Sequence, residues 1–140
     1  ALEREDVSAT WFMVEFWTKK YPEYVKKIDG AGHEIGTHSA THSYMSRLTK
    51  EEISAELHSS SQAIADITGK TVELFRPPYG DYNDLLITTA EAEGLFTIQW
   101  DVDSLDWKDL SANGFTFKSI GQMIYRDGYT LDSDGRQQLT

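Results

Sequence analysis

The chain has 140 residues, a hydrophobic fraction of 39% and a formal net charge of −10 at pH 7. This length suits one domain with a modest core, and this hydrophobic fraction excludes a disordered chain. The acidic balance argues against nucleic acid as a substrate, and the lack of cysteine excludes disulfides and thiolate metal sites. No apolar run approaches the roughly 20 residues that span a bilayer, and no signal peptide opens the sequence.

Helix and strand patterns alternate along the chain. Ala1–Asp6 is expected to be the tail of a helix. Four segments with β-branched and aromatic residues predict buried strands: Val7–Val14, His33–Thr37, Thr71–Phe75 and Leu95–Asp101. Between them, helices are expected at Pro22–Asp29, from the capping box Thr49–Glu52 to Gly69, and from a cap at Asp81 or Asn83 to Gly94. The alternation predicts a parallel α/β architecture.

Three unusual polar motifs each follow a predicted strand. They occupy residues 38–42, 76–80 and 103–107. In parallel α/β folds, and above all in barrels, the carboxyl edge of the strands holds the active site. The sequence therefore predicts that the three motifs meet at one edge of the sheet.

His38 and His42 are the candidate metal ligands. Four residues apart, they would lie on one side of a helix or a tight helical turn. Neutral imidazole is a common zinc ligand, and without cysteine the remaining ligands must be imidazole or carboxylate. The pair alone also fits two unrelated loop histidines, so the metal interpretation depends on the other two motifs.

Each of those motifs also has a plain alternative. Arg76 could be a surface charge, although the prolines and glycine of Arg76-Pro77-Pro78-Tyr79-Gly80 fix its direction. Asp103 and Asp106 could cap a helix, and Trp107 could fill a core. Together with the histidines they suit metal-assisted hydrolysis, in which a carboxylate takes a proton from water and cationic or amide donors hold an oxyanion.

The chain resembles the polysaccharide deacetylases, carbohydrate esterase family 4, and in particular their peptidoglycan and chitooligosaccharide deacetylase-like members. Gly32–His42 is similar to the family's metal-binding motif, Arg76–Gly80 to its third motif and Trp100–Trp107 to its fourth. The resemblance implies a distorted (β/α) barrel that removes N-acetyl groups from N-acetylglucosamine or N-acetylmuramic units of peptidoglycan or chitin-like glycans.

The same resemblance implies roles for individual residues. His38 and His42 would bind a divalent metal, most often Zn²⁺, with Co²⁺ or Ni²⁺ also accepted, and an aspartate would be the third ligand. The N–H of Tyr79 would stabilise the oxyanion, Arg76 would orient the catalytic carboxylate, and Asp106 would tune the general acid. The substrate would lie against three residues of the site: Pro77, Trp100 and Trp107. His33 is expected to be structural, and His58 to be a surface or packing residue.

Two family motifs are absent from this sequence. The first, an aspartate-rich motif that supplies the base and the third ligand, would precede the first helix, and the sequence is expected to start after it. The fifth, which supplies the general-acid histidine, has no counterpart, since no histidine follows His58. A further segment is expected to be missing between Ala112 and Asn113, so the barrel is predicted to be incomplete. We expect a deacetylase domain at 1–125 and a polar tail at 126–140, in which Asp132 or Asp134 of a permuted first motif is a minor alternative.

Two hypotheses remain open at this point. The chain is a metal-dependent deacetylase domain, or it is a carbohydrate-binding remnant of the same fold that has lost its base and acid. Without those groups, the 140-residue chain by itself is expected not to hydrolyse its substrate and to hold zinc weakly. The family resemblance places the protein outside the cell or in the cell envelope, and the sequence does not indicate an oligomeric state.

Overall fold

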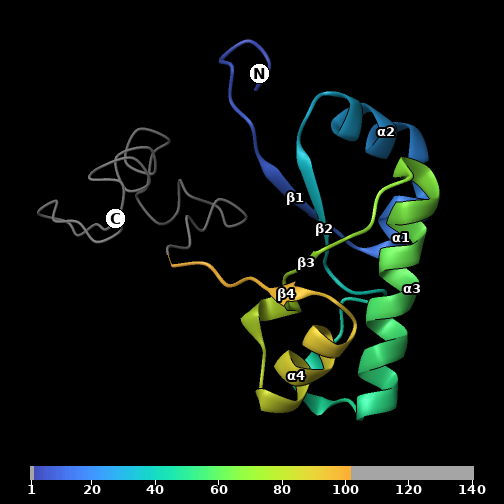
Figure 1. The fold of residues 1–140 in the computed structure, drawn as a ribbon, viewed down its shortest axis with the longest axis vertical. Coiled ribbons are helices and arrows are strands. Elements are labelled where there is room, and N and C mark those ends of the chain that lie inside the picture. Colours follow the sequence, from blue (N-terminus) through green and yellow to red (C-terminus); the bar gives the residue numbers. More distant parts are fainter. Residues whose placement is uncertain (1, 102–140) are drawn as a thin grey trace, which may run out of the picture. The chain divides into compact units, whose positions relative to one another are not determined.

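The computed structural model describes residues 2–101 (Figure 1). The chain divides into two units, Ala1–Gln99 and Trp100–Thr140, and the account below concerns the first. Its elements follow the chain in this order: β1 Thr10–Met13, α1 Glu15–Lys20, α2 Pro22–Gly30, β2 Glu34–Thr37, the 3-10 turn η1 Met45–Arg47, α3 Lys50–Thr68, β3 Leu74–Phe75, the 3-10 turn η2 Pro78–Gly80, α4 Asp84–Ala92 and β4 Phe96–Thr97.

The strands between residues 2 and 101 form one parallel sheet in the order β1-β2-β3-β4. Phe12 of β1 is paired with Gly36 of β2, and Phe75 of β3 is paired with Thr37 on one side and Thr97 on the other. Helices connect successive strands, as parallel pairing requires. The predicted parallel α/β architecture is therefore confirmed.

Helix α3 is the longest element of the described chain, and its ends are where the sequence placed them. Thr49 Oγ1 accepts the Glu52 N–H while the Glu52 carboxylate accepts the Thr49 N–H, which completes the predicted capping box. Gly69 ends the helix in the left-handed conformation, at φ 73°. In Figure 1, α3 (green) lies with α1 and α2 on one side of the strands.

A single hydrophobic core joins the sheet to these helices. Burial of apolar surface is the main driving force for such packing. The core residues come from every layer of the unit, and the largest fully buried ones are Phe75, Met45, Ile53, Leu57, Ile64, Leu86 and Val25. The regular spacing of Ile53, Leu57 and Ile64 along α3 places them on the face that packs here.

Several local predictions were wrong. Residues 2–6 form turns with two i→i+3 hydrogen bonds rather than the tail of a helix. The strands are shorter than expected, and β1 and β4 are not covered on both faces, since Trp11 is 40% exposed and Phe96 67% exposed. Both strands are at the edges of the described sheet. The short elements α1 and η1 were not predicted, because neither is long enough to show a helical period.

The helices between residues 2 and 101 include none with the length and apolar character needed to cross a bilayer.

Candidate active site

Two of the three polar motifs meet at the carboxyl ends of β2 and β3. The His38 N–H donates to Met13 O at 2.9 Å, and the Arg76 N–H donates to Thr37 O at 3.0 Å. These bonds extend the parallel ladder by one step beyond the strands. The backbones of His38 and Arg76 are therefore fixed side by side by the sheet.

The imidazole rings of His38 and His42 lie next to one another. Their centroids are 4.8 Å apart and their planes are inclined at 69°. Rings at this spacing are compatible with two imidazole ligands of one tetrahedral zinc ion, whose bonds to nitrogen are about 2.0–2.1 Å long. The structure thus brings the two predicted side chains together, and their role as metal ligands stays a prediction.

The backbone that joins the two histidines is a loop and not the helical turn expected from their spacing. Ser39 has φ 71° and His42 has φ 61°, and both values lie in the left-handed region that residues other than glycine rarely adopt. Ser39 is fully buried, and its Oγ accepts the His42 N–H at 3.0 Å while its carbonyl accepts the Glu15 N–H at 3.1 Å. These bonds hold a conformation that the sequence spacing alone does not specify.

The protonation of His38 suits a metal ligand. Its Nδ1 lies 2.7 Å from Arg76 O, and because a carbonyl can only accept, Nδ1 carries the proton. Burial is the main cause that lowers the pKa of His38, and the charges of His42 and Arg76 lower it further, against the opposite effect of the Arg76 carbonyl. The ring is therefore neutral at pH 7, with the Nε2 lone pair available for an ion.

Arg76, the residue after β3, is partly buried. Its guanidinium lies over the Phe12 ring, 4.2 Å from the centroid, and burial lowers the pKa of Arg76 without removing its charge. Its Nε is buried and has no hydrogen-bond partner among the described residues. A buried donor without a partner is costly, so this atom calls for an acceptor such as a carboxylate.

The turn after Arg76 presents Tyr79 toward the histidines. Tyr79 has φ 61°, and the turn is closed by the Gly80 N–H to Pro77 O and the Asp81 N–H to Pro78 O. The Tyr79 ring meets His42 edge to face at 4.7 Å and stacks on Tyr44 at 4.1 Å. Tyr44 was not predicted as a site residue, because nothing in its local pattern distinguishes it from a surface aromatic.

Asp81 and Asn83 attach this turn to η1. Asn83 is the helix cap of α4, which resolves the predicted choice between the two residues, since its Oδ1 accepts the Leu86 N–H. Asp81 instead accepts the Ser46 N–H at 2.9 Å and the Ser46 hydroxyl at 2.7 Å. These hydrogen bonds lower the pKa of Asp81, with a smaller effect from the charge of Arg47 and an opposing effect of burial.

The lowered pKa of Asp81 predicts a pH-dependent contribution to stability. A carboxyl whose pKa is lower in the folded protein stabilises it above the unfolded pKa, about 3.9, and loses that effect as the pH falls through the folded pKa. We expect Asp81→Asn to lower the free energy of unfolding by about 1 kcal/mol at pH 7. Urea unfolding of the unchanged chain and of Asp81→Asn at pH 7 and near pH 3 measures this loss. A difference in the free energy of unfolding that is the same at both pH values would contradict the assignment.

The other predicted site residues are only partly placed. Pro77 is fully buried and lines a groove of about 540 Å³ between β3, β4 and α4. Trp100 belongs to the second unit, and Asp103, Asp106 and Trp107 lie outside the described residues, as do the Ala112–Asn113 junction and the tail at 126–140. Residues 2–101 contain no group of three histidine or acidic residues that could hold an ion, so the third ligand stays a prediction.

Comparison with known proteins identifies the family. The sequence profile of the polysaccharide deacetylases matches residues 1–98. The chain belongs to the polysaccharide deacetylase family. The chain is 29% identical over 120 residues to a peptidoglycan-N-acetylglucosamine deacetylase of Bacillus cereus, with 86% of the chain and 44% of that protein covered. It is 36% identical over 136 residues to chitin deacetylase 1 of Saccharomyces cerevisiae, with 92% of the chain and 45% of that protein covered.

A solved structure extends the comparison to the fold. A carbohydrate esterase family 4 pseudoenzyme from Bacillus anthracis superposes with a TM-score of 0.80 at 30% identity, with 99% of the chain and 46% of that structure covered. The predicted fold class, an incomplete α/β barrel of the deacetylase type, is thus confirmed. The deacetylase chain spans less than half the length of these three proteins.

Proposed function

We propose that this deacetylase domain serves a metal-dependent hydrolase that removes N-acetyl groups from N-acetylglucosamine or N-acetylmuramic units of peptidoglycan or chitin-like glycans. The observation that carries the proposal is the neighbouring pair His38 and His42, with the Nδ1 proton of His38 directed to Arg76 O. Such a pair fits Zn²⁺ best among the common ions, and Co²⁺ or Ni²⁺ share its preference for imidazole.

The residues around this pair have distinct tasks in amide hydrolysis. A bound divalent ion supplies Lewis acidity to the acetyl carbonyl and to water. His38 and His42 hold that ion, and the Tyr79 N–H donates a hydrogen bond to the oxyanion that forms when water adds to the carbonyl carbon. Arg76 orients the carboxylate that takes the proton of the attacking water, which its unpartnered Nε supports. The carbon–nitrogen bond then breaks, and acetate and a protonated amine leave.

The remaining predicted residues complete the site on the glycan side. Asp106 tunes the general acid that protonates the leaving amine, while Trp100 and Trp107 contact the sugar. The buried Pro77, predicted as a third contact, supports the wall of its groove. The substrate is a glycan of the cell wall or of a chitin-like polymer, so the protein is placed outside the cell or in the cell envelope. Residues 1–125 form the deacetylase domain, and 126–140 a polar tail.

A second candidate, a carbohydrate-binding remnant without activity, is favoured by one comparison. The structure with a TM-score of 0.80 is a pseudoenzyme of the same family. In this candidate the histidine pair and the aromatic side chains persist, while the general base and acid do not act.

Acetate release separates the two candidates. The polypeptide that carries this domain is incubated with an N-acetylated chitooligosaccharide and with peptidoglycan fragments, and free acetate is measured enzymatically. We expect release that a chelator stops and zinc restores. Retardation by immobilised glycan without acetate release would support the remnant, and neither binding nor release would overturn both candidates.

A further inference from the structure

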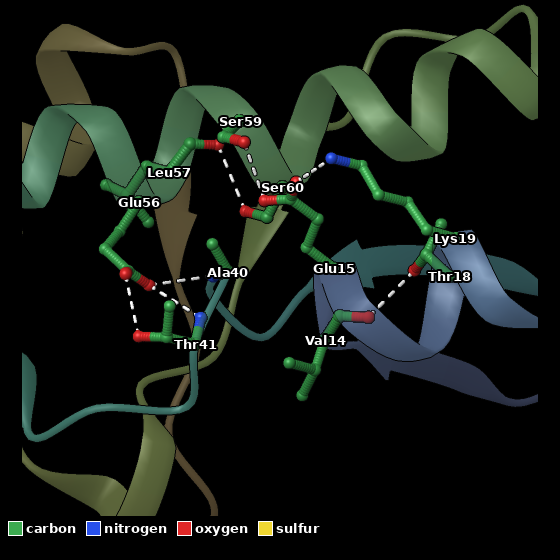
Figure 2. Close-up of polar contacts among 10 residues, drawn as sticks. All are labelled: Val14, Glu15, Thr18, Lys19, Ala40, Thr41, Glu56, Leu57, Ser59 and Ser60. Carbon is green, nitrogen blue, oxygen red and sulfur yellow. Dashed lines mark hydrogen bonds and ion pairs between the residues drawn. The ribbon is translucent and has the colours of Figure 1, made fainter.

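The loop between the two histidines is attached to helix α3 through one side chain. Figure 2 shows the Glu56 carboxylate reaching from α3 to residues 40 and 41. Its Oε2 accepts the N–H groups of Ala40 and Thr41, both at 2.9 Å, and its Oε1 accepts the Thr41 hydroxyl at 2.8 Å. Three donors from two consecutive residues thus share one carboxylate, and hydrogen bonds to a carboxylate are stronger than those to a neutral acceptor.

The helix holds Glu56 firmly in place. Its neighbours in the sequence and one turn before, Leu57 and Ile53, are fully buried in the core. Glu56 itself is half-buried, between this core and the loop. The core therefore fixes the backbone of Glu56, and its carboxylate is the group through which α3 binds the loop.

The sheet provides a second, independent attachment at the start of the loop. The Thr37 hydroxyl, at the end of β2, lies 2.5 Å from the Ser60 hydroxyl of α3 and accepts the Ser39 N–H at 3.2 Å. This attachment fixes the residue after His38. It does not reach Ala40 and Thr41, which leaves Glu56 as the contact that α3 makes with the middle of the loop.

We propose that Glu56 is a positioning residue of the metal site. By holding Ala40 and Thr41, it sets the path of the chain that brings the His42 ring to within 4.8 Å of the His38 ring. The loop includes two residues in the left-handed region, so without the carboxylate its backbone relaxes toward commoner conformations and the rings separate. The inference rests on the proposed function, because the ion that the two rings share belongs to that proposal.

Glu56→Ala tests the inference through two measurements on the 140-residue chain. We expect faster hydrogen exchange of the Ala40 and Thr41 amides without metal, and a loss of zinc affinity of about 10- to 100-fold in isothermal titration, the range seen when an outer-shell partner of a metal ligand is removed. Glu56→Gln keeps one acceptor oxygen, so its affinity is expected to lie between those of the unchanged chain and Glu56→Ala.

Glu52→Ala is the matched control. It removes a glutamate of the same helix, one turn earlier, whose carboxylate caps α3 and does not touch the loop. It is expected to lower the melting temperature while zinc affinity and the two amide exchange rates stay unchanged. Equal zinc affinity in Glu56→Ala and the unchanged chain would overturn the positioning role alone. Absence of zinc binding in the unchanged chain would overturn the metal site and with it this role.

Discussion

His38→Ala and His42→Ala are each expected to lower zinc affinity by at least about 100-fold, more than removal of any outer-shell residue. Each variant removes one of the two imidazole rings whose centroids lie 4.8 Å apart, so a single predicted histidine ligand is left. A single imidazole binds zinc too weakly to compete with water and buffer molecules, which are also zinc ligands. Titration with zinc in the presence of a chromophoric chelator measures the change.

Two further variants make this measurement specific. His38→Asn keeps a donor near the position of Nδ1, so the bond to Arg76 O can persist while the ligand nitrogen is lost. His58→Ala removes an exposed histidine of α3 that is not a predicted residue of the site. We expect His38→Asn to lose zinc with little change in stability and His58→Ala to keep it. Equal affinities across all the variants would refute the assignment of the ligands.

The largest loss of stability is expected from Gly36→Ala. A Cβ at this position of β2 would lie 2.7 Å from a Phe12 ring carbon and 2.8 Å from Leu74 O. One obstacle is a strand backbone, and the other is the ring that supports the Arg76 guanidinium at 4.2 Å. We expect the free energy of unfolding to fall by about 3 kcal/mol, at the upper end of what overpacking costs. Urea unfolding followed by circular dichroism measures it.

Gly30→Ala is the control for this substitution. Gly30 is the last residue of α2, and a Cβ there meets nothing within 4 Å. Alanine has a higher helix propensity than glycine, so the stability of Gly30→Ala is expected to equal or slightly exceed that of the unchanged chain. If the two alanine variants unfolded at the same urea concentration, the close packing of β1, β2 and β3 around Gly36 would not limit stability.

The parts of the fold that depend on local chemistry could be predicted from the sequence. The capping box at Thr49 and Glu52 and the end of the helix at Gly69 follow from neighbouring residues, and the parallel sheet follows from the alternation of elements. The meeting of His38 and Arg76 follows from the same alternation, because parallel strands end at a common edge.

The parts that depend on long-range contacts could not be predicted. A spacing of four residues fits both a helical turn and a loop with left-handed residues. The loop is selected by contacts of the folded chain, which are the hydrogen bonds of the buried Ser39 and those that the Glu56 carboxylate accepts. Glu56 and Tyr44 have no sequence pattern that marks them as site residues, since the site residues that they contact, Thr41 and Tyr79, are 15 residues or more away in the sequence. Such residues can be recognised only when the fold brings their partners to them.

The backbone conformations at the site lower the stability of the fold. Four non-glycine residues of the described chain have positive φ, and three of them belong to the site: Ser39, His42 and Tyr79. Such conformations cost about 1–3 kcal/mol each. A glycine at position 79 would relieve one of them but would also discard the ring between Tyr44 and His42. Variants selected only for heat resistance should therefore accumulate changes at these positions and lose the arrangement needed for chemistry, a trade-off between durability and activity.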